Sequence, residues 1–437
     1  MTEFRADTRR SDFKIELLVV FAILVSLGFP GNFTVIFGDR LGTVMEYAAF
    51  VIEILAMLLS SGSSWLNIRL INLDRKYTMI YLLAAVLFVE SMLVSRYPSL
   101  QFITCFRLTV TILFAIWLQE HFRFVRVVEL ICIAQAIFLL FNLLFMLLYP
   151  GRAFESGASF FHALRGLYET KNTFAYEMIF GIISMSFLVR EKREKQAPCK
   201  FWVLLLLAQA VMLLMCQSTG AIFCLLVVLL PLALRDRVRL PLGWVMILGS
   251  IGFLLVALLV IPHMEWFFYA IGKDPTLTGR IPFWNQVLSV ITTHKTLTGY
   301  GYSMFWRDPQ AIALIHAGFS EYSFMGTMTS GAHNMLLDLW LNIGLVGLGM
   351  FFATLLYSMR RMAEIPQNKY LFCSMFVIFL TVNGMVERCL TGSYSYKVFS
   401  IFLVMAACCN RPQAEKQSLF PLRREEPQAA EEGQSDA

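Results

Sequence analysis

Long apolar segments recur along almost the whole chain. Each is about 17–25 residues long, the length that an α-helix needs to cross the hydrocarbon core of a bilayer. The chain has 437 residues and 58% of them are hydrophobic, more than a soluble domain could hide. The sequence therefore predicts an all-α integral membrane protein with about twelve transmembrane helices. These cover 15–36, 41–60, 77–95, 100–118, 127–149, 172–189, 201–217, 219–234, 242–262, 334–357, 370–387 and 394–409.

The two ends of the chain differ from this apolar region. Residues 1–13 are polar and are expected to form a cytoplasmic N-terminal segment. The predicted membrane domain covers 14–410, and its first apolar segment lacks a small-residue cleavage site, so we expect a retained helix. Beyond Asn410 the chain turns polar and acidic, so 411–437 are expected to form a disordered cytoplasmic tail.

The distribution of Lys and Arg predicts the orientation of these helices. With twelve spans and a cytoplasmic N-terminus, the inner segments hold 24 Lys and Arg, the outer loops hold 11, and Arg107 lies within a span. Cytoplasmic segments normally carry this excess. Two long outer segments result, 149–172 and 263–333, and the second is by far the longest.

Several other classes of protein fit poorly. The nine cysteines include no CxxC pair and no Cys/His cluster, so neither a disulfide framework nor a metal site is expected. The formal charge of +6 is spread over the loops and does not indicate a nucleic-acid partner. A glycolipid transporter or flippase is an alternative, but the sequence shows no internal repeat and its polar residues gather toward the outer ends.

The outer stretch 276–294 predicts an amphipathic helix lying on the outer membrane surface. Thr278 is a reasonable N-terminal cap. Arg280 stands at the helix start, where a guanidinium and backbone N–H groups together could bind a phosphate. The alternative is that Arg280 extends to lipid headgroups. The apolar residues at helical spacing are Ile281, Trp284, Val287, Leu288 and Ile291.

His333 and Asn334 immediately precede the apolar run that reaches Tyr357. A helix start favours the neutral imidazole, which is a base near pH 7. Asp338 lies one turn deeper, on the face of Asn334. On these residues alone, a capping or interfacial histidine is the favoured interpretation, and a catalytic base is the alternative.

Other polar and aromatic residues leave similar alternatives open. Arg165 and Lys171, before the sixth helix, could bind phosphate or contact headgroups. Tyr300, between two glycines, could stack on a sugar ring or anchor the chain at the interface. Four charged residues within spans would form structural pairs or a proton path: Glu53, Glu90, Arg107 and Glu177.

Five short motifs occur in the order seen in the O-antigen ligase and polysaccharide polymerase family, which the chain resembles. They are Lys171-Asn172, Ser218-Thr219-Gly220, Thr278-Gly279-Arg280 with Trp284, Gly299-Tyr300-Gly301, and His333-Asn334 followed by GLVGLG at 344–349. The family includes exopolysaccharide polymerases of Gram-negative bacteria. The resemblance is densest over about 165–350.

The resemblance implies a metal-independent, inverting glycosyltransferase with a C-type membrane fold and no cofactor. The donor would be a glycan on undecaprenyl pyrophosphate, and the acceptor a second glycan in a polymerase or lipid A-core in a ligase. A chain-length regulator would be a further partner. The enzyme would lie in the bacterial inner membrane, with its active site and the 263–333 loop facing the periplasm.

The resemblance also assigns roles to residues. His333 is similar to the family's proposed base, and Arg280 resembles the arginine that holds the pyrophosphate. The remaining expected substrate-binding residues are Lys171, Arg165, Asn172, Thr278, Tyr300 and Asn334. Many ligases carry an arginine directly after the serine of the hairpin, where this chain has Thr219. A second phosphate contact is therefore supplied by Lys171 or Arg165, or is absent, and this departure favours polymerase over ligase.

Overall fold

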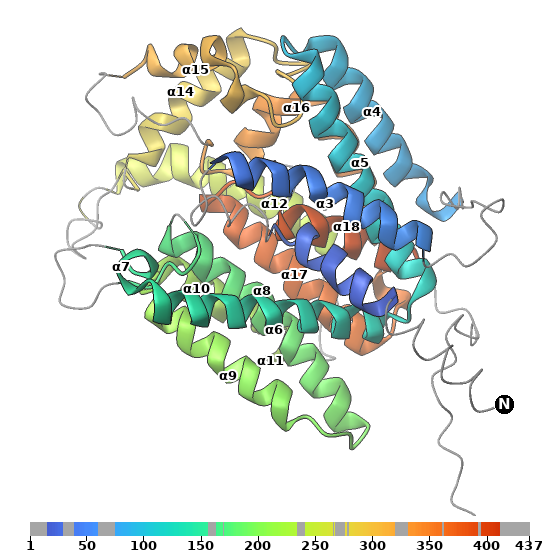
Figure 1. Ribbon diagram of the computed structural model, residues 1–437. Helices are drawn as coiled ribbons and strands as arrows, with labels where there is room; N and C mark the ends of the chain where they lie inside the picture. Colours follow the sequence, from blue (N-terminus) through green and yellow to red (C-terminus); the bar gives the residue numbers. More distant parts are fainter. Residues whose placement is uncertain are drawn as a thin grey trace, which may run out of the picture.

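A computed structural model of the chain describes residues 15–28, 39–59, 75–155, 163–168, 170–233, 241–264, 266, 276–277, 279–319, 331–360, 362–391 and 395–410. The regular secondary structure in these ranges is helical, apart from one isolated antiparallel bridge between Phe154 and Leu164, and turns and irregular segments connect the helices (Figure 1). The predicted cytoplasmic segment 1–13 and tail 411–437 lie outside the described residues, as do parts of the predicted 263–333 loop.

The helices follow the predicted apolar segments to within a few residues at most boundaries. In chain order they are Ile15–Ser26, α3 (Asp39–Leu59), α4 (Thr78–Val94), α5 (Pro98–His121), α6 (Phe124–Leu148), α7 (Pro150–Ala153), α8 (Lys171–Glu194), α9 (Lys200–Met215), α10 (Thr219–Val228), α11 (Leu230–Ala233), α12 (Leu242–Leu255), α14 (Arg280–Thr293), α15 (Pro309–His316), α16 (Met335–Met359), α17 (Gln367–Val386) and α18 (Tyr396–Cys409).

Seven helical segments in the described part of the chain are long and apolar enough to cross a membrane. They are Arg75–Val94, Pro98–His121, Phe124–Leu148, Lys171–Glu194, Leu242–His263, Met335–Met359 and Gln367–Val386. Five shorter apolar helices accompany them, at Ile15–Ser26, Phe50–Leu59, Lys200–Met215, Thr219–Leu232 and Tyr396–Cys409. The all-helical, membrane-protein character agrees with the prediction, and the number of about twelve spans stays a prediction.

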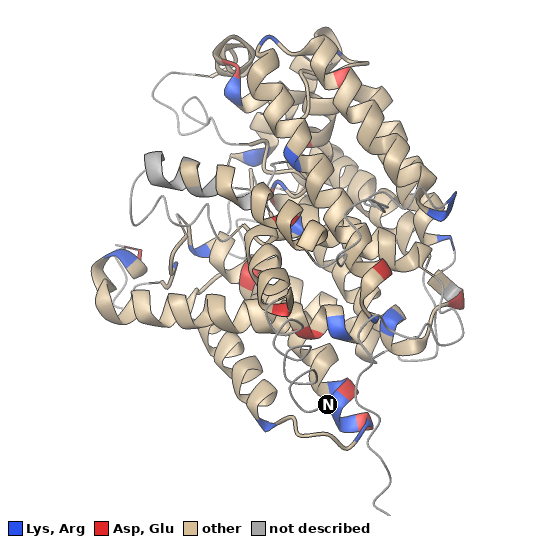
Figure 2. Cartoon of the chain, turned by 45° about the vertical axis from the view of Figure 1, so that its right-hand side comes forward, with Lys and Arg blue, Asp and Glu red and all other residues tan. Residues whose placement is uncertain are grey.

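The two helices α8 and α17 form the centre of the bundle. They pack against each other, α8 also contacts α6 and α9, and α17 also contacts α10 and α12. Aromatic side chains fill the interface, for example Phe180 and Phe376 with ring centroids 5.1 Å apart. Outward faces stay apolar, because Leu93 is 81% exposed and Leu147 is 72% exposed. Most of the helical ribbon carries no charged residue (Figure 2), as expected for helices that face lipid.

The helix α16 is broken at Gly344, whose backbone has φ 57° and ψ −172°. The segment 296–301 lies in the break and supplies the missing main-chain partners. Tyr300 and Gly301 donate N–H bonds to the carbonyls of Leu341 (3.0 Å) and Asn342 (2.8 Å), while Thr296 and Leu297 accept from Leu345 (3.0 Å) and Val346 (3.1 Å). A Cβ on Gly344 would lie 2.1 Å from the carbonyl oxygen of Leu297. Glycine at this position therefore allows the segment to dock.

Two expectations about the stretch 276–294 need correction. Its N-terminal cap is Gly279, in the left-handed conformation with φ 79°, and not Thr278, which lies outside the described residues. The apolar face of the helix α14 is also not free to contact lipid. Its Trp284 is fully buried and donates an indole N–H bond to the carbonyl of Ala332 at 2.8 Å. The apolar face that suggested a lipid partner instead packs against the protein.

Candidate functional site

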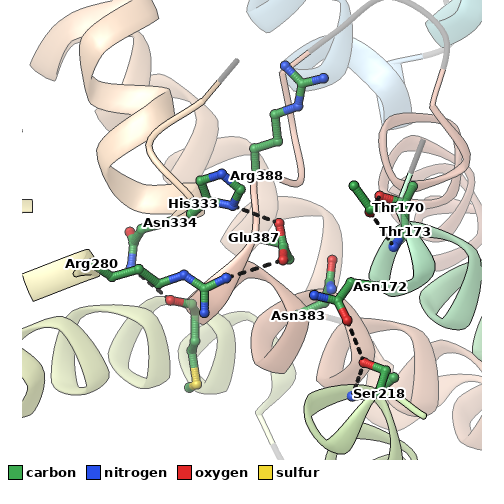
Figure 3. Close-up of polar contacts among 12 residues, drawn as sticks. Thr170, Asn172, Thr173, Ser218, Arg280, His333, Asn334, Asn383, Glu387 and Arg388 are labelled. Atoms are coloured by element: carbon green, nitrogen blue, oxygen red, sulfur yellow. Dashed lines mark hydrogen bonds and ion pairs between the residues drawn. The ribbon is translucent and has the colours of Figure 1, made fainter. Parts of the chain in front are cut away.

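The carboxylate of Glu387 joins Arg280 and His333 in one cluster (Figure 3). Arg280 Nη2 lies 3.5 Å from Glu387 Oε1, and His333 Nδ1 lies 3.0 Å from Glu387 Oε2. Arg280 begins α14, His333 precedes α16, and Glu387 directly follows α17. The three side chains are 26%, 25% and 18% exposed, so they are half-buried yet accessible. Three separate helix ends thus bring these side chains to one point.

The backbone of His333 is held in an uncommon conformation. Its φ is 48°, in the left-handed region that residues other than glycine rarely adopt. The next residue, Asn334, caps α16 by accepting from the N–H groups of Leu336 (3.0 Å) and Leu337 (3.2 Å). Its amide nitrogen donates to the carbonyl of Met385 on α17 at 3.2 Å. This strain, kept in place by surrounding bonds, is characteristic of functional positions.

Asp338 anchors the chain just before His333. Its Oδ1 accepts from the backbone N–H of Ala332 at 2.9 Å and from the indole N–H of Trp306 at 2.8 Å. Asp338 is completely buried. The carbonyl of Ala332 is also occupied, by Trp284. The imidazole of His333 therefore projects from a segment that is fixed on both sides.

The charge balance of the cluster favours an ionised carboxylate. Burial alone would raise the pKa of Glu387, but the hydrogen bond and charge of His333, together with the charges of Lys397 and Arg280, lower it below the usual 4.5. Lys397, near the start of α18, is only 8% exposed and donates to the carbonyl of Arg388 at 3.0 Å. Two permanent cations therefore flank one carboxylate, and an incoming anion would meet a positive field.

A second polar group lies beside this cluster, at the starts of α8 and α10. The hydroxyl of Ser218 caps α10 and donates to the side-chain oxygen of Asn172 at 2.9 Å. Tyr176, one turn beyond Asn172, interacts electrostatically with Glu387. A Cβ on Gly220 would lie 3.1 Å from the Tyr176 hydroxyl. The hairpin after Ser218 and the start of α8 therefore adjoin the carboxylate (Figure 3).

Comparison with known families identifies part of the chain. Residues 201–352 match the family model of O-antigen ligase. Over this part of its length the chain is similar to the O-antigen ligase family. No curated protein sequence matches the chain. The match indicates a glycosyltransferase-like enzyme of the ligase or polymerase type in a multi-pass membrane protein.

The O-antigen ligase segment 201–352 contains Arg280 and His333 and ends before Glu387 and Lys397. Sequence reasoning missed both of the latter residues. A signal was present, because Glu387 and Arg388 form a charged pair at the outer end of a predicted span, where an arginine is disfavoured. The sequence could not show that Glu387 contacts His333, because Glu387 lies 54 positions further along the chain and follows another helix.

Three predicted substrate-binding residues lie outside the cluster. The main-chain N–H of Lys171 donates to Glu155 Oε1 at 2.8 Å, and the Nε of Arg165 donates to the carbonyl of Arg152 at 2.9 Å. Tyr300 is 8% exposed and its N–H bonds to Leu341. Leu341 lies eight residues along α16 from His333, or about 12 Å. Binding of substrate by these residues stays a prediction.

Three of the four predicted intramembrane charged residues have partners in the described part of the chain, whereas Glu90 Oε2 is buried there without a hydrogen-bond partner. Glu53 accepts from Ser26 at 2.7 Å, and Glu177 accepts from Gln135 at 2.8 Å. The guanidinium of Arg107 lies 4.6 Å from the ring centroid of Tyr47. These contacts favour structural pairing over a proton path. Among the residues that the structure describes, no group of three or more His, Cys, Asp or Glu could hold a metal ion.

Proposed function

We propose that the protein is a membrane glycosyltransferase that polymerises oligosaccharide repeats carried on undecaprenyl pyrophosphate into a surface polysaccharide. In this proposal the reaction occurs at the periplasmic face of a bacterial inner membrane. The observation that supports it is the Arg280–Glu387–His333 cluster, because it combines a base with a cation that can hold a phosphate leaving group. The O-antigen ligase match over 201–352 supports the same class of reaction.

His333 acts as the general base in this proposal. With Glu387 ionised, the imidazole Nδ1–H donates to the carboxylate, and the lone pair of Nε2 is left to accept a proton. An acceptor hydroxyl attacks the anomeric carbon, its proton passes to Nε2, and the bond from that carbon to the pyrophosphate oxygen breaks. Attack opposite the leaving group inverts the configuration. Glu387 then stabilises the imidazolium that has formed.

Arg280 binds the leaving pyrophosphate. Its contact with Glu387 is long, at 3.5 Å, so the remaining N–H groups of the guanidinium can bind phosphate oxygens. Many ligases have an arginine where this chain has Thr219. In the proposal Lys397 supplies the second cation instead of that arginine. Its Nζ lies 5.9 Å from the ring centroid of Tyr176, which also adjoins Gly220. Lys397 and the hairpin that carries Thr219 therefore both lie next to Tyr176.

A ligase that transfers the glycan to lipid A-core is the second candidate, since it would use the same donor. The threonine at 219 favours the polymerase. A gene deletion distinguishes the two by the surface glycans of the cell. Loss of long polymer with single repeats retained supports the polymerase. Loss of glycan from lipid A-core, with polymer retained on its lipid carrier, supports the ligase.

The Arg280 assignment is tested with purified lipid-linked donor and measured product length. We expect Arg280→Ala to abolish polymer formation and Arg280→Lys to recover only part, because a single ammonium cannot reproduce a two-point contact with phosphate. Arg152→Ala is the matched control, since Arg152 is an exposed arginine outside the cluster. Full activity in Arg280→Ala would remove Arg280 from the reaction.

A further inference from the structure

A second group of cations lies at the other end of α16, far from Glu387. A cavity of about 500 Å³ opens there between the start of α4, the end of α16 and the end of α18. Because α16 runs from Met335 beside the cluster to Met359, the two places lie at opposite ends of this helix. The cavity is lined by Arg75, Lys76, Tyr357, Ser358, Arg360 and two cysteines of α18.

Two guanidinium groups at this cavity have no carboxylate partner among the described residues. Lys76 is neutralised by Glu120, at 2.6 Å. Arg75 and Arg360 are exposed and form no ion pair with any residue that the structure describes. Arg360 stacks on the ring of Tyr357, with the guanidinium carbon 4.1 Å from the ring centroid. None of the lining residues is acidic, so the cavity carries excess positive charge.

A buried hydroxyl also faces this cavity. Ser358 is 2% exposed, its Oγ has no nitrogen or oxygen partner within the described part of the chain, and it interacts with the thiol of Cys409 in the same cavity. Serine and threonine inside a helix usually bond to the carbonyl four residues earlier. Thr354, one turn before, does so with Met350 at 2.8 Å. Because a thiol is a weak hydrogen-bond partner, the Ser358 hydroxyl can donate to a stronger acceptor beside two arginines.

We propose that this cavity binds the phosphate of an anionic glycerophospholipid headgroup. Arginine is suited to phosphate because its planar fork can contact two oxygens at once. Arg75 and Arg360 approach from two different helices, and the Ser358 hydroxyl supplies a third donor. Basic pockets between transmembrane helices are known sites for such headgroups.

The position of the cavity favours a lipid over a soluble phosphate. Two of its three walls belong to segments long enough to span a membrane, Arg75–Val94 and Met335–Met359, and the cavity lies where both end. Headgroups occupy this level of a bilayer. Leu82, less than two turns from the start of α4, is 47% exposed and offers an apolar surface to an acyl chain.

Native mass spectrometry of the purified full-length protein tests the proposal. The probes are phosphatidylglycerol, zwitterionic phosphatidylcholine of the same acyl chains, and inorganic phosphate. The test variant is Arg75→Gln/Arg360→Gln. The matched control is Arg123→Gln/Lys200→Gln, which removes the same charge from two exposed residues at the starts of α6 and α9. Ser358→Ala examines the hydroxyl alone.

We expect retained phosphatidylglycerol to exceed phosphatidylcholine in the wild type and the control. In the test variant this preference should fall roughly tenfold or more, and Ser358→Ala should lower it less. An unchanged preference in the test variant would overturn the proposal. Displacement of the lipid by millimolar inorganic phosphate would overturn the lipid assignment in favour of a soluble phosphate. Thermal unfolding of both double variants near the wild-type temperature shows that they are folded.

Discussion

The His-Asn segment and the Gly-Tyr-Gly segment both contact α16, yet they surround their central residues differently. His333 is 25% exposed and its imidazole meets a carboxylate. Tyr300 is 8% exposed and packs edge-on against Phe305, with ring centroids 4.9 Å apart. Both segments were expected to bind substrate. A left-handed backbone conformation at or beside a polar or aromatic residue can therefore occur at a reactive site or at a purely structural contact. The side chains around the residue decide which of the two roles it has.

The largest effect should come from His333→Asn. Asparagine tolerates the left-handed backbone, so this variant should fold while lacking the base. We expect the rate of transfer from purified lipid-linked donor to fall by about 10²–10⁴. Donor binding should persist. Turnover within a few-fold of wild type would show that His333, like Tyr300, has a structural role only.

Glu387→Gln should have the next largest effect. The amide keeps the size of the side chain but removes the charge that stabilises an imidazolium. A loss of transfer on the order of 10² is expected for loss of a carboxylate that orients a functional histidine. If Glu387 acts only on folding, the rate per folded molecule will be unchanged.

The acid dependence of stability gives an independent measurement on Glu387. Its folded-state pKa is lowered from 4.5, so its contribution to stability is present above that pH and is lost as the pH falls through the lower value. The difference in unfolding temperature between wild type and Glu387→Gln should therefore be largest above pH 4.5 and shrink on acidification. A constant difference would contradict the ionised carboxylate.

Gly344→Ala examines the scaffold side of the comparison. The new Cβ would lie 2.1 Å from the carbonyl oxygen of Leu297, in a backbone conformation that alanine rarely adopts. We expect the free energy of unfolding to fall by about 1–3 kcal/mol. Gly349→Ala is the matched control, because nothing lies within 4 Å of a Cβ placed there. Equal unfolding temperatures for the two variants would contradict the docking role.

The smallest effect is expected from Tyr300→Phe. The ring that packs against Phe305 is kept and only the hydroxyl is removed, so transfer should stay within about twofold of wild type. Tyr300→Ala should lower thermal stability, because it leaves a cavity. A loss of transfer in Tyr300→Phe with unchanged stability would move Tyr300 into the substrate site and end the contrast with His333.

The sequence predicts where the helices lie better than it predicts which segments pack against each other. Apolar runs define where α16, α17 and α18 begin and end, because the length and composition of a span are local properties. The prediction of an amphipathic helix within 276–294 was also correct. However, an apolar face in the sequence does not show whether that face packs against lipid or against protein. Arg280 and His333 could be found from charge and position. Their shared partner Glu387 could not, since its contact depends on how α14, α16 and α17 pack.

The broken helix α16 also limits how a large substrate can reach the cluster. Four main-chain hydrogen bonds hold 296–301 in the break at Gly344. In a membrane, each backbone group left without a partner costs several kcal/mol. These bonds oppose movement of the segment as a gate during each reaction cycle. In the proposed reaction, the lipid-linked glycan therefore passes on another side of the cluster, and the longer product leaves by a route that keeps this closure intact.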